Sequence, residues 1–252
     1  MRKRSSSQIR RYGFPHGVTE PFWLFDNDSV LKEHPKYQAA KAGGVDAAVE
    51  LVSALAVDFL VSIADKLPQD AMYVAPHARE AAGDNAIPQV LATACALVMQ
   101  GSVETDIVQM TRVYHTGADP MERMCLRAEF KGNVTPGARY VLVDDVTNMG
   151  GTLAELANYL QYAGGIVVAV IVLVNAGRDK RFHPANKIIR EIEKRYPHDI
   201  EKIFSIVPNA LTANEASYLI GFRSADEIRN RFVKARKETN LRLRSKGIER
   251  QN

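Results

Sequence analysis

Short apolar runs alternate with segments of helical periodicity along most of the chain. Strand-like apolar runs lie at 71–75, 105–111, 140–143, 166–174 and 203–207. Apolar residues recur at three- and four-residue intervals, as on one face of a helix, at 46–67, 87–99 and 152–162. The run 166–174 is almost purely branched and apolar, which is typical of a strand buried on both faces. This order predicts an α/β fold: a doubly wound parallel sheet of about five strands flanked by helices, with ligands at the carboxyl ends of the strands.

The two ends of the chain differ from this middle part. Residues 1–20 are charged and rich in Ser and Gly, so we expect them to be loosely attached. The aromatic cluster at 22–25 is more typical of side chains that pack on a core edge than of solvated ones. We therefore divide the chain into a basic tail with a possible hood segment (1–42), a core (43–208) and a basic, helical C-terminal extension (209–252).

Composition narrows the class of protein. Of the 252 residues 46% are hydrophobic, an ordinary value for a globular protein, and no apolar stretch reaches the roughly 18 residues that span a bilayer. The net charge of +4 comes from the ends: residues 1–11 hold five Lys or Arg and no acid, and residues 229–252 hold nine Lys or Arg and two acids. Cys95 and Cys125 lack a metal-binding spacing. We expect a cytoplasmic protein with no secretory leader and no membrane segment.

The run YVLVDDVTNMGGTLAEL, which begins at Tyr140, is the most informative part of the chain. A buried strand is expected to end at Asp144 and Asp145, followed by a Gly-rich loop and the start of a helix. Glycines let a phosphate approach the free N–H groups at a helix N-terminus. The paired carboxylates suit hydroxyls or a hydrated magnesium ion. The sequence thus predicts a phosphate-binding loop next to an acidic pair.

The stretch Val141–Thr152 resembles the signature of the type I phosphoribosyltransferases, in which a strand, two acidic residues, a hydrophobic residue and a Thr/Gly-rich loop bind phosphoribosyl pyrophosphate. The resemblance implies an enzyme that uses this substrate and Mg²⁺ to transfer phosphoribose to a nitrogenous base, or the reverse, and that forms a homodimer. If residues 1–42 supply the hood over the base, the aromatic residues at 22–25 could stack on that base instead of packing on a core edge. The resemblance also implies that Asp144 and Asp145 are catalytic, hold the ribose hydroxyls and bind the metal through water. The implied 5′-phosphate loop consists of Thr147, Asn148, Met149, Gly150, Gly151 and Thr152.

Two positions of this loop depart from the family pattern. Asn148 and Met149 stand where small hydroxyl residues are usual. A hydrogen bond to a charged group is worth about 1.5–3 kcal/mol. On sequence alone, Met149→Thr is therefore expected to tighten phosphate binding.

Further loops complete the implied site. The resemblance places pyrophosphate on His77, Ala78, Arg79 and Arg112, with Arg112 also catalytic. For His77 an exposed loop histidine is the alternative. The stretch His115–Asn133 lacks periodicity and would be either a mobile loop that closes over the substrates or a solvated connector. Its candidate residues are Arg123, Arg127 and Lys131, in a segment that resembles the competence-linked branch of the family.

The C-terminal extension suggests an alternative function. Thr212 with Glu215 and Ser224 with Glu227 have capping-box spacing, so two helices are expected around a turn at Gly221. This pattern resembles a helix-turn-helix with a basic second helix. The alternative function is a regulator that senses phosphoribosyl pyrophosphate or a nucleotide and binds DNA. We favour the enzyme, with the two helices packed on the sheet and a solvated basic tail that has little to do with the pocket.

Overall fold

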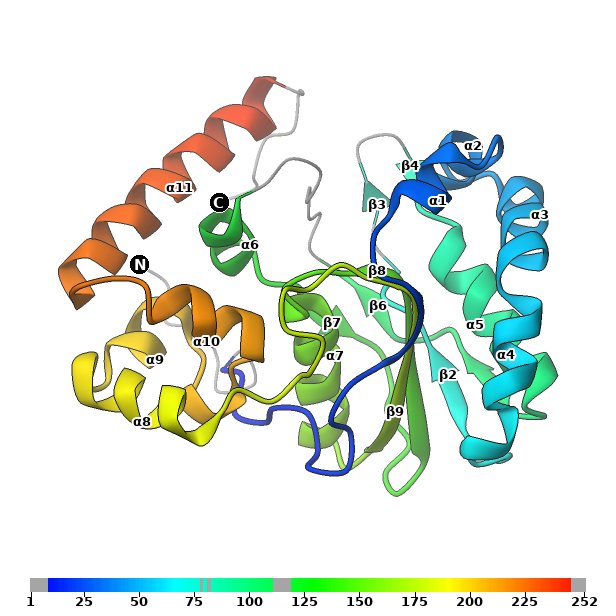
Figure 1. Cartoon of the computed structure of the whole chain (residues 1–252), viewed down its shortest axis with the longest axis horizontal. Helices are drawn as coiled ribbons and strands as arrows, with labels where there is room; N and C mark the ends of the chain where they lie inside the picture. Colours follow the sequence, from blue (N-terminus) through cyan, green and yellow to red (C-terminus); the bar gives the residue numbers. More distant parts are fainter. Residues whose placement is uncertain (1–8, 78, 81–82, 111–118, 246–252) are drawn as a thin grey trace.

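A five-stranded parallel sheet forms the centre of the protein (Figure 1). The structure is a computed structural model and describes residues 9–77, 79–80, 83–110 and 119–245. The strands lie in the order β1, β9, β8, β2, β5, and every neighbouring pair is parallel. They are β1 (Phe22–Phe25), β2 (Met72–Val74), β5 (Ser102–Glu104), β8 (Arg139–Thr147) and β9 (Ile166–Asn175). The predicted parallel α/β sheet is confirmed.

Helices cover both faces of this sheet, because its central strands are apolar on both sides. Along β8, Val141 and Val143 point into one buried cluster, whereas Tyr140 and Leu142 point into another. The first cluster is covered by α3 (Val45–Leu55), α4 (Val57–Ile63), the 3₁₀ turn Ala64–Lys66 and α5 (Ile87–Val98). The second is covered by α7 (Gly151–Tyr162). Two short helices, α1 (Ser29–Glu33) and α2 (Tyr37–Lys41), follow the edge strand β1.

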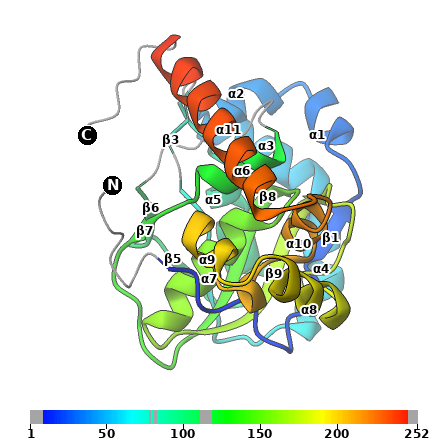
Figure 2. The ribbon, with the colours of Figure 1, turned by 90° about the vertical axis from the view of Figure 1, so that its left-hand side faces the viewer.

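A separate group of helices lies beside α7 (Figures 1 and 2). Its members are α6 (Pro120–Cys125), α8 (Asn186–Arg195), α9 (Asp199–Phe204), the 3₁₀ turn Pro208–Ala210, α10 (Ala213–Leu219) and α11 (Ala225–Ser245). These helices share a hydrophobic cluster of their own, which we call the C-terminal cluster. Its buried members include Met121, Met124, Met149, Ile189, Ile192, Tyr196, Phe204, Leu219, Ile228 and Ala235. The C-terminal extension is therefore packed against the rest of the protein through an apolar core.

Two small antiparallel hairpins complete the described fold. One pairs β3 (Arg79–Glu80) with β4 (Gly83–Asp84), and the other pairs β6 (Val108–Gln109) with β7 (Phe130–Lys131). The strand predicted at 105–111 is wrong in its bounds, because β5 ends at Glu104 and the chain then turns into β6. The Asp106 carboxylate accepts a hydrogen bond from the Asn133 N–H at 2.8 Å, which ties this turn to β7.

Two other predicted elements differ from the structure. The long helix predicted at 46–67 is bent by 59° at Ala56, a residue type that marks no break in a sequence. The strand predicted at 203–207 is wrong: Ile200, Ile203 and Phe204 belong to α9, and Ile206 makes a single bridge to Arg10. Within the described residues, no single helix is long and apolar enough to cross a membrane. The bent pair formed by 45–55 and 57–66 has a sufficient length and apolar content when the two parts are taken together.

The N-terminal segment is packed, against the prediction for residues 1–20. Arg10 is fully buried, and its backbone exchanges hydrogen bonds with Ser205 and Val207. Phe14 stacks on Phe182 with ring centroids 3.8 Å apart. Residues 22–25 form an edge strand whose aromatic side chains pack on the two sheet clusters, as expected for a covered core edge. Residues 1–8 lie outside the described residues.

Candidate functional site

The sharp turn between β8 and α7 forms the base of the candidate site. Gly150 precedes the first residue of α7 with φ 76°, a left-handed conformation that glycine adopts without strain. At Gly151, a Cβ atom would lie 3.0 Å from a carboxylate oxygen of Glu215. Gly150 has no side chain that could cap the N-terminus of α7, so the backbone N–H groups there are suited to an anionic ligand.

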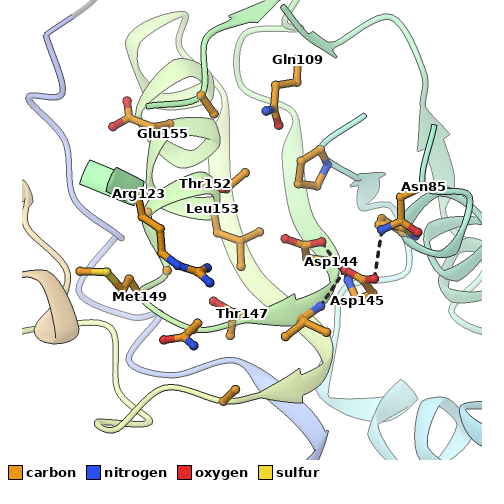
Figure 3. Close-up of a pocket in the computed structure, with 18 of the residues that line it drawn as sticks. Asn85, Gln109, Arg123, Asp144, Asp145, Thr147, Met149, Thr152, Leu153 and Glu155 are labelled. Carbon is orange, nitrogen blue, oxygen red and sulfur yellow. Dashed lines mark hydrogen bonds between the residues drawn. The ribbon is translucent and has the colours of Figure 1, made fainter. Parts of the chain in front are cut away.

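A cavity of about 370 Å³ opens over this turn (Figure 3). All nine residues from Asp144 to Thr152 line it, so the acidic pair and the whole implied 5′-phosphate loop face one space. Other lining residues come from distant parts of the chain: Asp28, Lys32, Tyr37, Lys41, Asn85, Gln109, Arg123, Arg127, Glu155 and Glu215. The cavity therefore lies where the sheet, the α1–α2 segment and the C-terminal helices meet.

The acidic pair lies within β8, which continues to Thr147 and does not end at the pair as predicted. The Asp144 carboxylate nevertheless accepts a hydrogen bond from the Asp145 N–H at 2.9 Å. The Asp145 carboxylate in turn accepts one from the Val146 N–H, also at 2.9 Å. These local bonds turn both side chains along the backbone, so that both border the cavity although successive strand residues normally face opposite sides.

The two carboxylates have different surroundings. Asp145 accepts hydrogen bonds from Asn85 at 3.0 Å and from the Lys41 ammonium at 3.2 Å. Burial, together with the charge of Asp145, raises the pKa of the Asp144 carboxyl well above its usual range. Asp145 thus has a cationic and an amide partner. The charged form of Asp144 would be stabilised by a ligand that brings a positive charge or a hydroxyl donor.

The carboxylates of this site suit Mg²⁺ only if phosphate groups of a substrate supply further ligands. Within the described residues, no group of three or more His, Cys, Asp or Glu side chains could hold a metal. Mg²⁺ usually binds through one or two carboxylates together with substrate phosphates and water. Asp144 and Asp145 supply two carboxylates on one cavity, which is the protein contribution that such a site needs.

The residues implied for pyrophosphate are only partly placed. Ala78 and Arg112 lie outside the described residues, and for Arg79 the structure describes the backbone in β3 alone. His77 is half-buried, and its carbonyl accepts a hydrogen bond from the Gln109 N–H at 3.0 Å. The Gln109 side chain lines the cavity, which the sequence reasoning missed because no motif includes it.

The three residues of the implied mobile loop have different positions. Arg123 lies on α6 and extends into the cavity toward the Thr147 end of the loop (Figure 3). Arg127 is buried and makes two hydrogen bonds of 2.6 Å to the Glu155 carboxylate. Lys131 is exposed on β7. The described part of this stretch, 119–133, thus includes a helix and a strand, and of the three candidate residues Arg123 and Arg127 border the cavity whereas Lys131 does not.

Four buried charged residues lie beneath the loop. Arg10 forms ion pairs with Glu215 and, at 3.3 Å, with Glu155. Arg127 also binds Glu155 and donates to the carbonyls of residues 204 and 205 at 2.7 and 2.8 Å. Two positive and two negative side chains thus join the N-terminal segment, α7, α10 and the end of α9. The sequence identified Glu215 only as a capping residue and did not indicate this second role.

The segment before α10 is bonded directly to the loop. Thr212 and Glu215 form the predicted capping box, with the Glu215 N–H donating to the Thr212 hydroxyl at 3.1 Å. The Thr212 hydroxyl itself donates to the Met149 carbonyl at 2.6 Å. Met149 has its side chain in the C-terminal cluster and is 7% exposed. Its side chain therefore anchors the loop. The family pattern, which has a small hydroxyl residue at this position, could not indicate that role.

Comparison with curated proteins finds two bacterial relatives. Protein TraN of Escherichia coli is 36% identical over 219 residues, which cover 82% of this chain and 48% of that protein. An uncharacterized protein of Haemophilus influenzae is 35% identical over 129 residues, covering 50% of this chain and 29% of its own length. The chain thus spans about half the length, or less, of the curated relatives it matches. No protein-family model matches the chain.

Among solved structures, adenine phosphoribosyltransferases are similar to this chain. The enzyme of Leishmania donovani is 15% identical, with a TM-score of 0.36, and the match covers 64% of this chain and 89% of that one. The enzyme of Thermoanaerobacter pseudethanolicus is 19% identical, with a TM-score of 0.34, over 52% of this chain and 73% of that one. Similarity of this extent assigns no activity to the chain.

Proposed function

We propose that the protein is a phosphoribosyltransferase that transfers phosphoribose from phosphoribosyl pyrophosphate to a nitrogenous base, or catalyses the reverse reaction. One observation carries the proposal. The motif Val141–Thr152 forms a strand, a glycine turn and a helix start, and its acidic pair and loop line one cavity. A phosphate at the helix N-terminus and hydroxyls at the acidic pair match the two ends of a ribose 5-phosphate group.

The residues have distinct roles in this proposal. Backbone N–H groups from Asn148 to Thr152, with the Thr147 and Thr152 hydroxyls, hold the 5′-phosphate. Asp144 and Asp145 accept hydrogen bonds from the ribose hydroxyls and so fix the ring. As the bond from the anomeric carbon to pyrophosphate breaks, the sugar becomes positively charged, and the two carboxylates stabilise this charge electrostatically until a ring nitrogen of the base bonds to that carbon. Bound Mg²⁺ would neutralise the departing pyrophosphate.

The α1–α2 segment supports a position for the acceptor base. Lys32 and Tyr37 line the cavity, and so does Asp28, which pairs with Lys32 at 2.8 Å. This segment lies inside the possible hood, residues 1–42. The aromatic residues 22–25 are not among the described lining residues, so we assign them to the sheet and place the base near Tyr37.

Calorimetry with phosphoribosyl pyrophosphate, with and without Mg²⁺, tests the proposal. We expect binding that strengthens with Mg²⁺, followed by pyrophosphate release when the right purine or pyrimidine base is added. Absence of detectable binding at millimolar ligand would refute the proposal. If binding is found, a screen of purine and pyrimidine bases for pyrophosphate release identifies the acceptor.

The alternative, a DNA-binding regulator, has weaker support. The α10–α11 pair has the expected turn, but α10 is bonded to the 5′-phosphate loop through Thr212. Two basic residues of α11 are engaged within the chain, Arg229 with Asp199 and Arg231 with Asp119. These contacts leave fewer basic side chains for DNA phosphates. Dimer formation and a cytoplasmic location stay predictions.

A further inference from the structure

Helix α6 carries Arg123 into the cavity opposite the 5′-phosphate loop. The helix begins at Pro120, after Asp119, whose carboxylate accepts a hydrogen bond from the Glu122 N–H at 3.0 Å. Glu122 completes the capping box by accepting from the Asp119 N–H at 2.9 Å. Arg123 follows on the cavity side, and in Figure 3 its guanidinium extends in the direction of Thr147, which lines the same cavity. A guanidinium that shares a cavity with the glycine turn suits a charge-assisted bond to a phosphate bound at that turn.

The position of α6 is set by α11, which runs alongside it (Figures 1 and 2). Arg231 of α11 forms an ion pair with Asp119, the residue that caps α6. Further along α11, the buried Thr239 hydroxyl contacts the Glu122 carboxylate at 3.4 Å. Apolar contacts accompany these bonds, since both helices contribute to the C-terminal cluster. The contributing residues are Met121 and Met124 of α6 and Ile228 and Ala235 of α11.

The floor of the site is attached to the same cluster. Met149 of the 5′-phosphate loop is one of its buried members. The loop below the cavity and Arg123 above it are thus both fixed to one body of helices, and α11 is the longest of them. Thr239 is buried, so at this residue the C-terminal tail is packed and not solvated as the sequence suggested.

We propose that α11 is a positioning element of the cavity, which holds α6 so that Arg123 binds the 5′-phosphate seated on the Thr147–Thr152 turn. The inference rests on the proposed function for the identity of that phosphate. Burial lowers the pKa of Arg123 below its ordinary value, and a bound phosphate would offset this cost. Arg123 contacts the ligand, whereas Arg231 acts through α6.

Titration calorimetry with ribose 5-phosphate tests both parts, using Arg123→Gln, Arg231→Gln and the double variant. The matched control is Arg229→Gln, which removes the same charge from α11 at a residue paired with Asp199 and Asp226, away from α6. We expect Arg123→Gln to weaken binding roughly ten- to hundredfold, as loss of a bond to a charged group should. Arg231→Gln should weaken it by less, and Arg229→Gln should change it less than about twofold, as an exposed ion pair predicts.

The double variant separates positioning from general stability. If Arg231 acts through Arg123, the double variant binds ribose 5-phosphate as weakly as Arg123→Gln alone, because coupled residues are not additive. Additive losses, or equal losses in Arg229→Gln and Arg231→Gln, would overturn the positioning role. Weaker pyrophosphate binding with unchanged ribose 5-phosphate binding would overturn the assignment of Arg123.

Failure of the inference can be told apart from failure of the proposed function. If ribose 5-phosphate binds with the expected dependence but no base releases pyrophosphate, the transferase proposal fails and the positioning role stands. If transfer occurs and Arg123→Gln binds ribose 5-phosphate as the wild type does, the inference fails alone. A wild-type protein that binds no ribose 5-phosphate refutes the inference, whereas the transferase proposal is decided by phosphoribosyl pyrophosphate binding and pyrophosphate release.

Discussion

Met149→Thr is the substitution that most sharply separates the structure from the sequence pattern. The pattern favours a hydroxyl at this position of the loop, whereas the structure places the Met149 side chain in the C-terminal cluster, 7% exposed. Replacing a buried Met by Ala typically costs about 2–5 kcal/mol. Thr fills more of the space than Ala would but places a hydroxyl against apolar neighbours, so we expect a loss of about 2–3 kcal/mol.

This loss can be measured by thermal unfolding. For a chain of this length a destabilisation of 1 kcal/mol lowers the Tm by about 2–4 °C, so Met149→Thr should lower it by roughly 5–10 °C. Met149→Leu is the matched control, because a volume-conserving exchange usually costs less than about 1.5 kcal/mol. Binding of phosphoribosyl pyrophosphate should be unchanged or weaker in Met149→Thr, since its loop has lost its apolar anchor.

The opposite outcome would refute this reasoning. The reasoning fails if Met149→Thr has the same Tm as the wild type and binds phosphoribosyl pyrophosphate more tightly. The side chain at position 149 would then face the phosphate, and other contacts would hold the loop. The Thr212 hydroxyl, which donates to the Met149 carbonyl, would then be the main anchor.

Three further predictions concern the acidic pair and the basic helix. Asp144→Asn and Asp145→Asn should each abolish pyrophosphate release yet keep a cooperative melt; full activity in both, or failure of both to fold, would contradict the assignment. Because burial raises the pKa of Asp144, its charged form destabilises the fold at neutral pH. Asp144→Asn should therefore melt above the wild type at pH 7, and the difference should disappear below about pH 4, where the carboxyl is protonated in both states. Binding to duplex DNA should be weak and independent of sequence, with a log–log salt slope of about −0.9 per phosphate neutralised; tight, sequence-preferring binding at physiological salt would favour the regulator.

Local sequence predicted the part of the site that is built from consecutive residues. The unit from Val141 to Thr152 is a strand, a glycine turn and a helix start, each of which has its own signal within a few residues. The same holds for the capping box at Thr212, which begins α10 as expected. Where the chemistry of an element depends on its own residues, the pattern was sufficient.

Elements that depend on distant contacts were not predictable in this way. The run 203–207 has the apolar content of a strand, yet Ile200, Ile203 and Phe204 share a helical face that the C-terminal cluster covers. The burial of Arg10 could not be foreseen, because its partners Glu155 and Glu215 are far along the chain. A basic N-terminal segment predicts solvation unless those partners are known.

These long-range contacts explain why the C-terminal helices are integral to the site. An isolated buried charge is costly, so Arg10 can be fully buried only where Glu155 and Glu215 already lie. Glu155 is on α7, whose N-terminus borders the cavity, and Glu215 is on α10, beside Gly151. Breaking this cluster would leave an unpaired charge under the glycine turn. The position of the turn therefore depends on Arg10 and Glu215, from opposite ends of the described chain, as well as on the sheet.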